Sequence, residues 1–294
     1  MVGINWIVNY RRFLKRRNHS AHTVKTYLHA IKQFALWVDI PIEQVSYGKF
    51  LLYIDHLLEL GLKATAINCH LSSIRRFYDY LRTEESVELT NPVKRGCGLR
   101  VPKPLPRALR DEQVGRFFAI IRKPRDRAMF MVMLRCGLRV EEVAHLTFGA
   151  LDLRRGSILV QHGKGGKDRM VYISPDAFEA LVKYLKARSS SKVKGLFLVE
   201  KGPYRGSPIS VRGIQKRMEY YAHKAGLRAC CHQLRHTMAT QLLNADADIV
   251  TIQDLLGHSR LSTTQRYSRV SNVKVQRDYF KAMELLMHDT ATEQ

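Results

Sequence analysis

The stretch HQLRH at residues 232–236 places two histidines and an arginine at the three- and four-residue spacings that bring side chains together on a helix. LGH follows at residues 256–258, and Tyr267 comes nine positions after the histidine of that motif. Arginine and histidine can stabilise negative charge on a phosphate, and a tyrosine hydroxyl can attack one. This part of the sequence therefore predicts a phosphoryl-transfer site.

Two upstream motifs add cations to this set. Arg139 lies within CGLRVEEV at residues 136–143, and Lys164 lies within GKGGK at residues 163–167. Attack of a hydroxyl on a phosphodiester builds negative charge on the non-bridging and leaving oxygens, so catalysis needs cations and an acid. The planar fork of arginine suits the phosphate because it gives two parallel hydrogen bonds. A tyrosine nucleophile would form a covalent phosphotyrosine that conserves the bond energy, so ligation would need no ATP.

Charge and length favour a nucleic-acid-binding protein of two domains. The chain has 294 residues and a formal net charge of +23, which attracts polyanions, although ribosomal RNA or a membrane surface would also satisfy the charge alone. Lys and Arg exceed Asp and Glu by 16 to 8 in residues 1–106 and by 33 to 18 in residues 107–294. Because both halves are basic, we expect two domains that bind the same duplex. A neutral enzyme with a basic tail would have a different charge distribution.

The cysteines and the apolar runs predict a cytoplasmic protein with no membrane partner. Five cysteines, at positions 69, 97, 136, 230 and 231, form no CxxC pair, which favours a reduced compartment. No apolar run follows a basic start as in a signal peptide, and the run at residues 128–134 is too short to span a bilayer.

The first ninety residues predict a helical bundle. Apolar residues recur at helical spacing over residues 4–17, 20–38, 46–60 and 64–82, with Pro41 and Gly61 as breaks. Four short-looped amphipathic helices form a small bundle, so we predict a helical domain over residues 1–90. Residues 91–106 contain four prolines among basic residues and predict an extended linker.

Residues 107–294 predict a mixed α/β domain. Residues 111–121 and 127–136 have helical patterns, and a further turn or two begins at Val140. Two β-rich runs at residues 157–161 and 169–173 bracket adjacent glycines, which predicts a hairpin with Lys164 beside its turn. The pattern is helical from Pro175 onward, apart from a short apolar run at residues 196–199.

Together these motifs, in this order and at this spacing, resemble the tyrosine recombinase (phage integrase-like) family, especially its compact Xer-type members. The resemblance extends over nearly the whole chain, with the helical first part similar to the SAM-like core-binding domain and residues 107–270 similar to the catalytic domain. It implies a mainly α fold with a small β-sheet. By motif, the catalytic residues correspond to Arg139, Lys164, His232, Arg235, His258 and the nucleophile Tyr267, with Glu142 and His236 in supporting roles.

The resemblance also implies a reaction and its partners. In that family the arginines bind the scissile phosphate, the lysine protonates the 5′-oxygen, the histidines assist, and the product is a 3′-phosphotyrosine. The expected function is site-specific recombination of double-stranded DNA, in integration, excision, transposition or resolution, by a homo-tetramer on two DNA sites. No metal or nucleotide cofactor is expected, and accessory DNA-bending proteins or a second recombinase are additional partners that the family uses.

Several alternatives stay open. A DNA-binding regulator derived from a recombinase would not need Tyr267 or Arg235, and both are present. A type IB-like topoisomerase or a telomere resolvase would use the same chemistry for another outcome. A zinc site at residues 230–236 is disfavoured, because Gln233 stands where the zinc protease motif has its glutamate and Arg235 puts a cation beside the ligands. Lys167 is the alternative to Lys164 as the acid.

The end of the chain predicts one more helix. Residues 273–288 have amphipathic content, and such a helix could cap its own domain or dock into a neighbouring protomer. The family resemblance favours docking on the neighbour.

Overall fold

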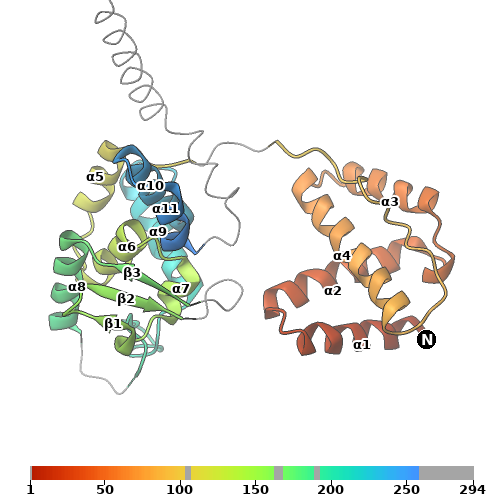
Figure 1. The fold of residues 1–294 in the computed structure, drawn as a ribbon, viewed down its shortest axis with the longest axis horizontal. Helices are drawn as coiled ribbons and strands as arrows, with labels where there is room; N and C mark the ends of the chain where they lie inside the picture. The colour runs from red at the N-terminus through yellow and green to blue at the C-terminus, as the bar shows by residue number, and fades with distance from the viewer. Residues whose placement is uncertain (1, 103–106, 162–167, 189–192, 258–294) are drawn as a thin grey trace, which may run out of the picture. The chain divides into compact units, whose positions relative to one another are not determined.

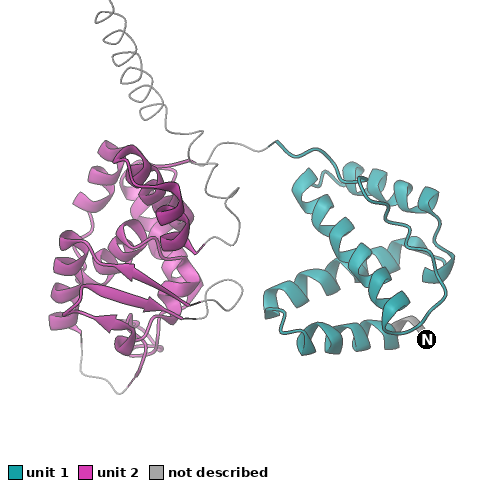
Figure 2. Cartoon of the chain, viewed as in Figure 1, with its two compact units in different colours: residues 1–103 teal, residues 104–294 magenta. Residues whose placement is uncertain are grey.

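The computed structural model describes residues 2–102, 107–161, 168–188 and 193–257. The chain divides into two compact units, Met1–Lys103 and Pro104–Gln294 (Figure 2). Several residues of the predicted site, namely Lys164, Lys167, His258 and Tyr267, lie outside the described residues, as does the predicted helix at 273–288.

The first unit is the helical bundle that the sequence predicts (Figure 1). Two of its helices start at a serine N-cap, since the hydroxyl of Ser20 accepts from the N–H of Thr23 and that of Ser46 accepts from the N–H of Lys49, both at 3.2 Å. A shared core of buried aromatic and aliphatic side chains holds the bundle together. Its helices are α1 (Val2–Arg16), α2 (Ala21–Val38), α3 (Tyr47–Glu59) and α4 (Ala64–Thr83), with a short 3-10 turn at Ile42–Gln44.

The first unit extends beyond residue 90, unlike the predicted domain. The side-chain amide of Asn68 on α4 accepts from the N–H of Leu99 and donates to its carbonyl, both at 2.8 Å. Arg75 on the same helix donates to the carbonyl of Val93 at 3.1 Å, and the Val93 side chain is buried. The proline-rich segment therefore packs on the bundle up to Leu99, because polar side chains of α4 satisfy its backbone groups.

The second unit combines helices with a three-stranded antiparallel sheet in the order β1-β2-β3. The predicted hairpin is present, with Val160 on β2 opposite Arg169 on β3, and the two-residue strand β1 was not predicted. Central helix α6 is buried along nearly its whole length and packs against α8 and α10. The elements are α5 (Asp111–Ala119), α6 (Pro124–Arg135), α7 (Val140–His145), β1 (Leu151–Asp152), β2 (Ser157–Val160), β3 (Arg169–Tyr172), α8 (Pro175–Ala187), α9 (Val211–Lys224), α10 (Cys231–Asn244) and α11 (Ile249–Leu256).

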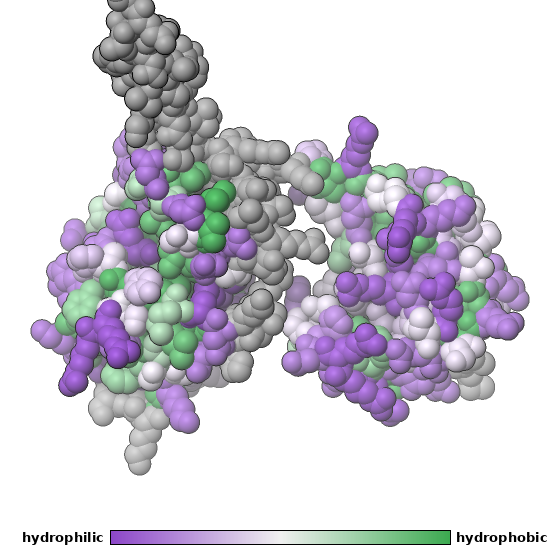
Figure 3. All heavy atoms as spheres, in the orientation of Figure 1, coloured by the Kyte–Doolittle hydropathy of each residue, from purple (hydrophilic) through white to green (hydrophobic). Residues whose placement is uncertain are grey.

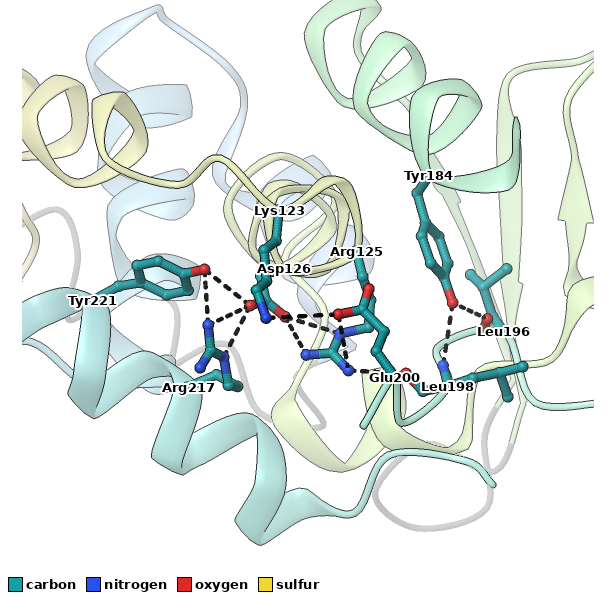
Figure 4. Close-up of polar contacts among 9 residues, drawn as sticks. All are labelled: Lys123, Arg125, Asp126, Tyr184, Leu196, Leu198, Glu200, Arg217 and Tyr221. Atoms are coloured by element: carbon teal, nitrogen blue, oxygen red, sulfur yellow. Dashed lines mark hydrogen bonds and ion pairs between the residues drawn. The ribbon is translucent and has the colours of Figure 1, made fainter. Parts of the chain in front are cut away.

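A buried ionic network fixes the N-terminal end of α6 (Figure 4). Asp126 is fully buried and accepts two hydrogen bonds from its neighbour Arg125, at 2.9 and 2.6 Å. Arg217 and Tyr221 on α9 donate to the other oxygen of Asp126, at 2.9 and 3.0 Å. Arg125 also donates to the carbonyl of Leu198 at 2.9 Å. The network ties α6 to α9 and to the segment after α8, so the helix that leads to Arg139 is firmly held.

The surface reflects the composition. On the face shown in Figure 3, hydrophilic side chains cover most of the first unit, with small hydrophobic areas between them. Among the described helices, none is both long and apolar enough to cross a membrane.

Candidate active site

Arg139 stands at the start of α7, directly after a tight turn. Gly137 makes this turn with φ +65°, a conformation that favours glycine. Glu142 accepts from the backbone N–H of Arg139 at 2.7 Å and from its guanidinium at 2.8 Å. The same carboxylate thus caps the helix and orients the arginine.

Arg169, which the sequence analysis did not single out, is the second partner of Glu142. Its two terminal nitrogens donate to the two carboxylate oxygens, both at 2.8 Å, in an end-on bidentate pair. Burial alone would raise the pKa of Glu142, but hydrogen bonds from Arg169 and from the Arg139 backbone, with the two guanidinium charges, lower it to about 2. Glu142 is therefore ionised at any working pH.

Arg235 projects from the first turns of α10 into the interior. It is 1% exposed, an unusual position for an arginine. One terminal nitrogen donates to the carbonyl of Gly137 and the other to the carbonyl of Leu256. The side chain therefore joins the turn before Arg139 to the end of α11.

Three arginines hold three successive carbonyls at the C-terminal end of α11. Arg169 donates to Leu255 at 2.9 Å, Arg235 donates to Leu256, and Arg139 donates to Gly257 at 3.4 Å. The last carbonyls of a helix lack partners within the helix and form the negative end of its dipole, so guanidinium groups stabilise them. The cluster thus draws α7, α10, α11 and β3 together (Figure 1).

A pocket of about 150 Å³ opens beside this cluster. It brings together three of the predicted catalytic side chains, and its lining is Leu138, Arg139, Val140, Glu141, Cys231, His232 and Arg235. Burial lowers the pKa of His232, and the charges of Arg235 and Arg139 lower it further. His232 is therefore neutral at pH 7 before a phosphate arrives.

His236 lies one turn after His232 on α10. The two rings meet edge to face, with centroids 4.3 Å apart and an interplanar angle of 74°. His236 is not among the residues that line the pocket. Within the ranges that the structure describes, no group of three His, Cys, Asp or Glu side chains could hold a metal ion.

The geometry is that of an anion site. Two guanidinium groups and a neutral imidazole line a small pocket together with the exposed residue Glu141. Among the described residues, the one carboxylate seen to bond Arg139 is that of Glu142, which is itself paired with a third guanidinium. Such an arrangement can bind a phosphate diester and stabilise the charge that develops on its oxygens.

Both units match known domains. Residues 107–273 match the phage integrase family, and residues 7–85 match the N-terminal SAM-like domain of phage integrases. The chain belongs to the phage integrase family. It is 32% identical over 285 residues to the tyrosine recombinase XerA of Thermococcus kodakarensis, a match that covers 96% of this chain and 97% of the relative. It is 34% identical over 282 residues to XerC of Bacillus pumilus, with 90% of each chain covered.

Solved integrase structures share the fold. The Tn1549 transposon integrase in complex with circular intermediate DNA has a TM-score of 0.73 at 20% identity, covering 89% of this chain and 94% of that one. A lambda integrase dimer bound to a COC′ core site has a TM-score of 0.73 at 18% identity, covering 90% and 94%. Family membership and the Xer relatives identify this integrase-family chain as a tyrosine recombinase, an enzyme that cuts and rejoins DNA in site-specific recombination.

Proposed function

We propose that the pocket beside α7 and α10 binds the scissile phosphate of a recombination site. Arg139 and Arg235 would hold the non-bridging oxygens, and His232 would add a hydrogen bond. The observation that carries the proposal is the meeting of these three side chains in one pocket, although Arg139 stands almost a hundred residues before the other two. Glu142 supports the arrangement by orienting Arg139.

The remaining groups complete the reaction by family resemblance. The Tyr267 hydroxyl attacks phosphorus and loses its proton, while the bond from phosphorus to the 5′-oxygen breaks. Lys164 gives a proton to that oxygen, so the products are a 3′-phosphotyrosine and a free 5′-hydroxyl. A 5′-hydroxyl from another strand reverses these steps and releases the tyrosine.

His258 is proposed to join the same pocket. It follows Gly257 directly, and the carbonyl of Gly257 accepts from Arg139 at 3.4 Å. The family resemblance and the position of His258 directly after Gly257 in the sequence support this proposal.

The partner is double-stranded DNA at a specific site, and the active assembly is proposed to be a homo-tetramer on two sites in the cytoplasm. The net charge of +23 supports strong, salt-dependent binding, because neutralised phosphates release condensed counterions. Accessory DNA-bending proteins or a second recombinase would act as additional partners in this assembly.

The nucleophile provides the test. On a nicked suicide substrate, wild-type protein should form a covalent complex, whereas Tyr267→Phe should form none while keeping the Kd for DNA within about threefold. Tyr204→Phe is the matched control, because Tyr204 is 74% exposed in the same unit. Excess EDTA should leave the wild-type yield unchanged. A covalent complex from the Tyr267 variant would refute the assignment, and loss of activity with EDTA that zinc restores would point to a metal site.

A further inference from the structure

Glu142 accepts four hydrogen bonds from two arginines. One oxygen accepts from the guanidinium groups of Arg139 and Arg169, both at 2.8 Å. The other accepts from the Arg139 backbone at 2.7 Å and from Arg169 at 2.8 Å. The Glu142 and Arg169 side chains are only 7% and 9% exposed, whereas that of Arg139 is 21% exposed. Of the two arginines, Arg169 is thus the one enclosed in protein.

Glu142, Arg139 and Arg169 together have a net charge of +1. Two guanidinium groups and one carboxylate sum to a single excess cation, and the more exposed cation is Arg139, which lines the pocket. Without Arg169, the carboxylate of Glu142 would have Arg139 as its main counter-ion. The pair would then be close to neutral, and its attraction for a phosphate would fall.

Arg169 also fixes the end of α11. Its Nε donates to the carbonyl of Leu255 at 2.9 Å, while its aliphatic part packs so closely on Gly257 that an added Cβ there would lie 3.0 Å from Cδ. Sheet pairing sets the position of Arg169 from the other side, because it is opposite Val160 in the β2–β3 register. The Arg169 side chain therefore connects strand β3 to two other parts of the unit: the Glu142 carboxylate, which orients Arg139, and the end of helix α11.

We propose that Arg169 is a positioning residue of this recombinase: it neutralises Glu142 so that Arg139 keeps its charge for the scissile phosphate, and it locks the end of α11 beside that phosphate. This inference rests on the proposed phosphate site. Arg169 does not line the pocket and is assigned no contact with DNA. Arginine is needed because lysine has a single nitrogen, which cannot reach both carboxylate oxygens and the Leu255 carbonyl together.

The experiment measures single-turnover cleavage of a nicked suicide substrate at saturating protein, together with the Kd for DNA and thermal unfolding. Arg169→Met should slow covalent complex formation by about 10- to 100-fold while the Kd changes by less than about threefold, because the defect lies in the orientation and charge of one phosphate ligand. Arg169→Lys keeps the charge and should fall between wild type and Arg169→Met. Arg135→Met is the control, since Arg135 pairs with Asp176 at 2.8 Å in the same unit and lies outside the pocket lining.

Combining Arg169→Met with Glu142→Gln separates this role from general stabilisation. If Arg169 acts through Glu142, removing the carboxylate removes the group that would neutralise Arg139, so the double variant should cleave no more slowly than the slower single variant. Rate losses that multiply would overturn the neutralisation of Glu142 by Arg169, and an Arg169→Met rate equal to wild type would overturn both parts of the inference. If Arg169→Met is unfolded at the assay temperature, Arg169→Lys decides alone: a loss of about fivefold or more with unchanged Kd supports the role, and a wild-type rate rejects it. The wild-type covalent yield tests the proposed function separately.

Discussion

Arg235 donates a hydrogen bond to the carbonyl of Gly137, so the buried arginine of α10 is tied to the turn that presents Arg139. The two proposed phosphate ligands are therefore placed by one contact, although they are distant in the sequence. Gly137 has φ +65°, and a Cβ on it would lie 2.6 Å from the sulfur of Met238 and 3.1 Å from Cδ2 of Leu256.

We expect Gly137→Ala to lower the free energy of unfolding by about 2–4 kcal/mol, from a disfavoured φ and a forced repacking. Cleavage should fall with it, since both arginines depend on this turn. Gly202→Ala is the control, because Gly202 has φ +82° with no atom within 4 Å of the added Cβ. Equal losses in the two variants, measured by chemical denaturation, would show that the packing around Gly137 is unimportant.

Lys164 is expected to act as the acid. Lys164→Ala should fail on normal DNA and regain covalent complex formation on a substrate with sulfur at the 5′ bridging position, because a thiolate leaves without a proton. Lys167→Ala is the comparison. Sulfur rescue of Lys167→Ala in place of Lys164→Ala would assign the acid to Lys167.

His232 should make stability depend on pH in a defined direction. Burial first, and the charges of Arg235 and Arg139 second, lower its pKa in the folded state below the ordinary value near 6.5. The unfolded chain then binds a proton more readily, so the stabilising contribution is complete above about pH 6.5 and is lost as the pH falls toward the folded pKa.

The difference in unfolding free energy between wild type and His232→Gln should therefore be constant above about pH 6.5 and shift against wild type below it. Bound DNA should raise the pKa of His232, as followed by NMR of the imidazole, because a phosphate favours the charged form. A pH-independent difference would contradict the burial of a neutral His232.

Asp126 offers a test of the scaffold. It is fully buried and pairs with Arg125 and Arg217. We expect Asp126→Asn to destabilise the protein by about 3–5 kcal/mol, because it leaves buried guanidinium charge without its carboxylate. Glu179→Gln, which breaks an exposed pair with Lys183, should leave the melting temperature nearly unchanged. A stable Asp126→Asn variant would mean that the network does not hold α6.

The C-terminal segment should link protomers. Deleting residues from Val275 onward should leave binding to a single DNA site intact and abolish recombination and synaptic complexes, measured by gel shift and by product formation. A truncated protein that recombines normally would show that the segment is dispensable. A truncated protein that unfolds would show that the segment caps its own domain.

The sequence predicted the helices well because their apolar residues repeat at helical spacing. The bundle, α5, α6, α7 and the β2–β3 hairpin all lie where this spacing and the glycine turn indicate. The strand β1 has only two residues, too few for an alternating pattern. The segment after residue 90 was assigned to a linker because its prolines exclude a helix, whereas hydrogen bonds from Asn68 and Arg75, distant in sequence, hold it on α4.

The catalytic motif and Glu142 were recognisable from the sequence, but the other contacts that hold the motif in place were not. Arg139, His232 and Arg235 carry a spacing that can be recognised, and the structure brings them together in one pocket. Arg169 begins strand β3 and follows a basic stretch of sequence, and neither feature indicates that its side chain bonds Glu142 on α7. Arg235 also bonds the backbone carbonyl of Leu256. Every residue has such a carbonyl, so no sequence pattern could identify this partner.

The hydrogen bonds at Leu99 and Leu109 mark where the chain is anchored to each of the two units. Leu99 is the last residue seen to be fastened to α4 through Asn68, and the N–H of Leu109 is fastened to Thr237 on α10 at 2.8 Å. Each unit thus has its own anchor for the chain. A cut between residues 99 and 109 would separate the two units without breaking either hydrogen bond.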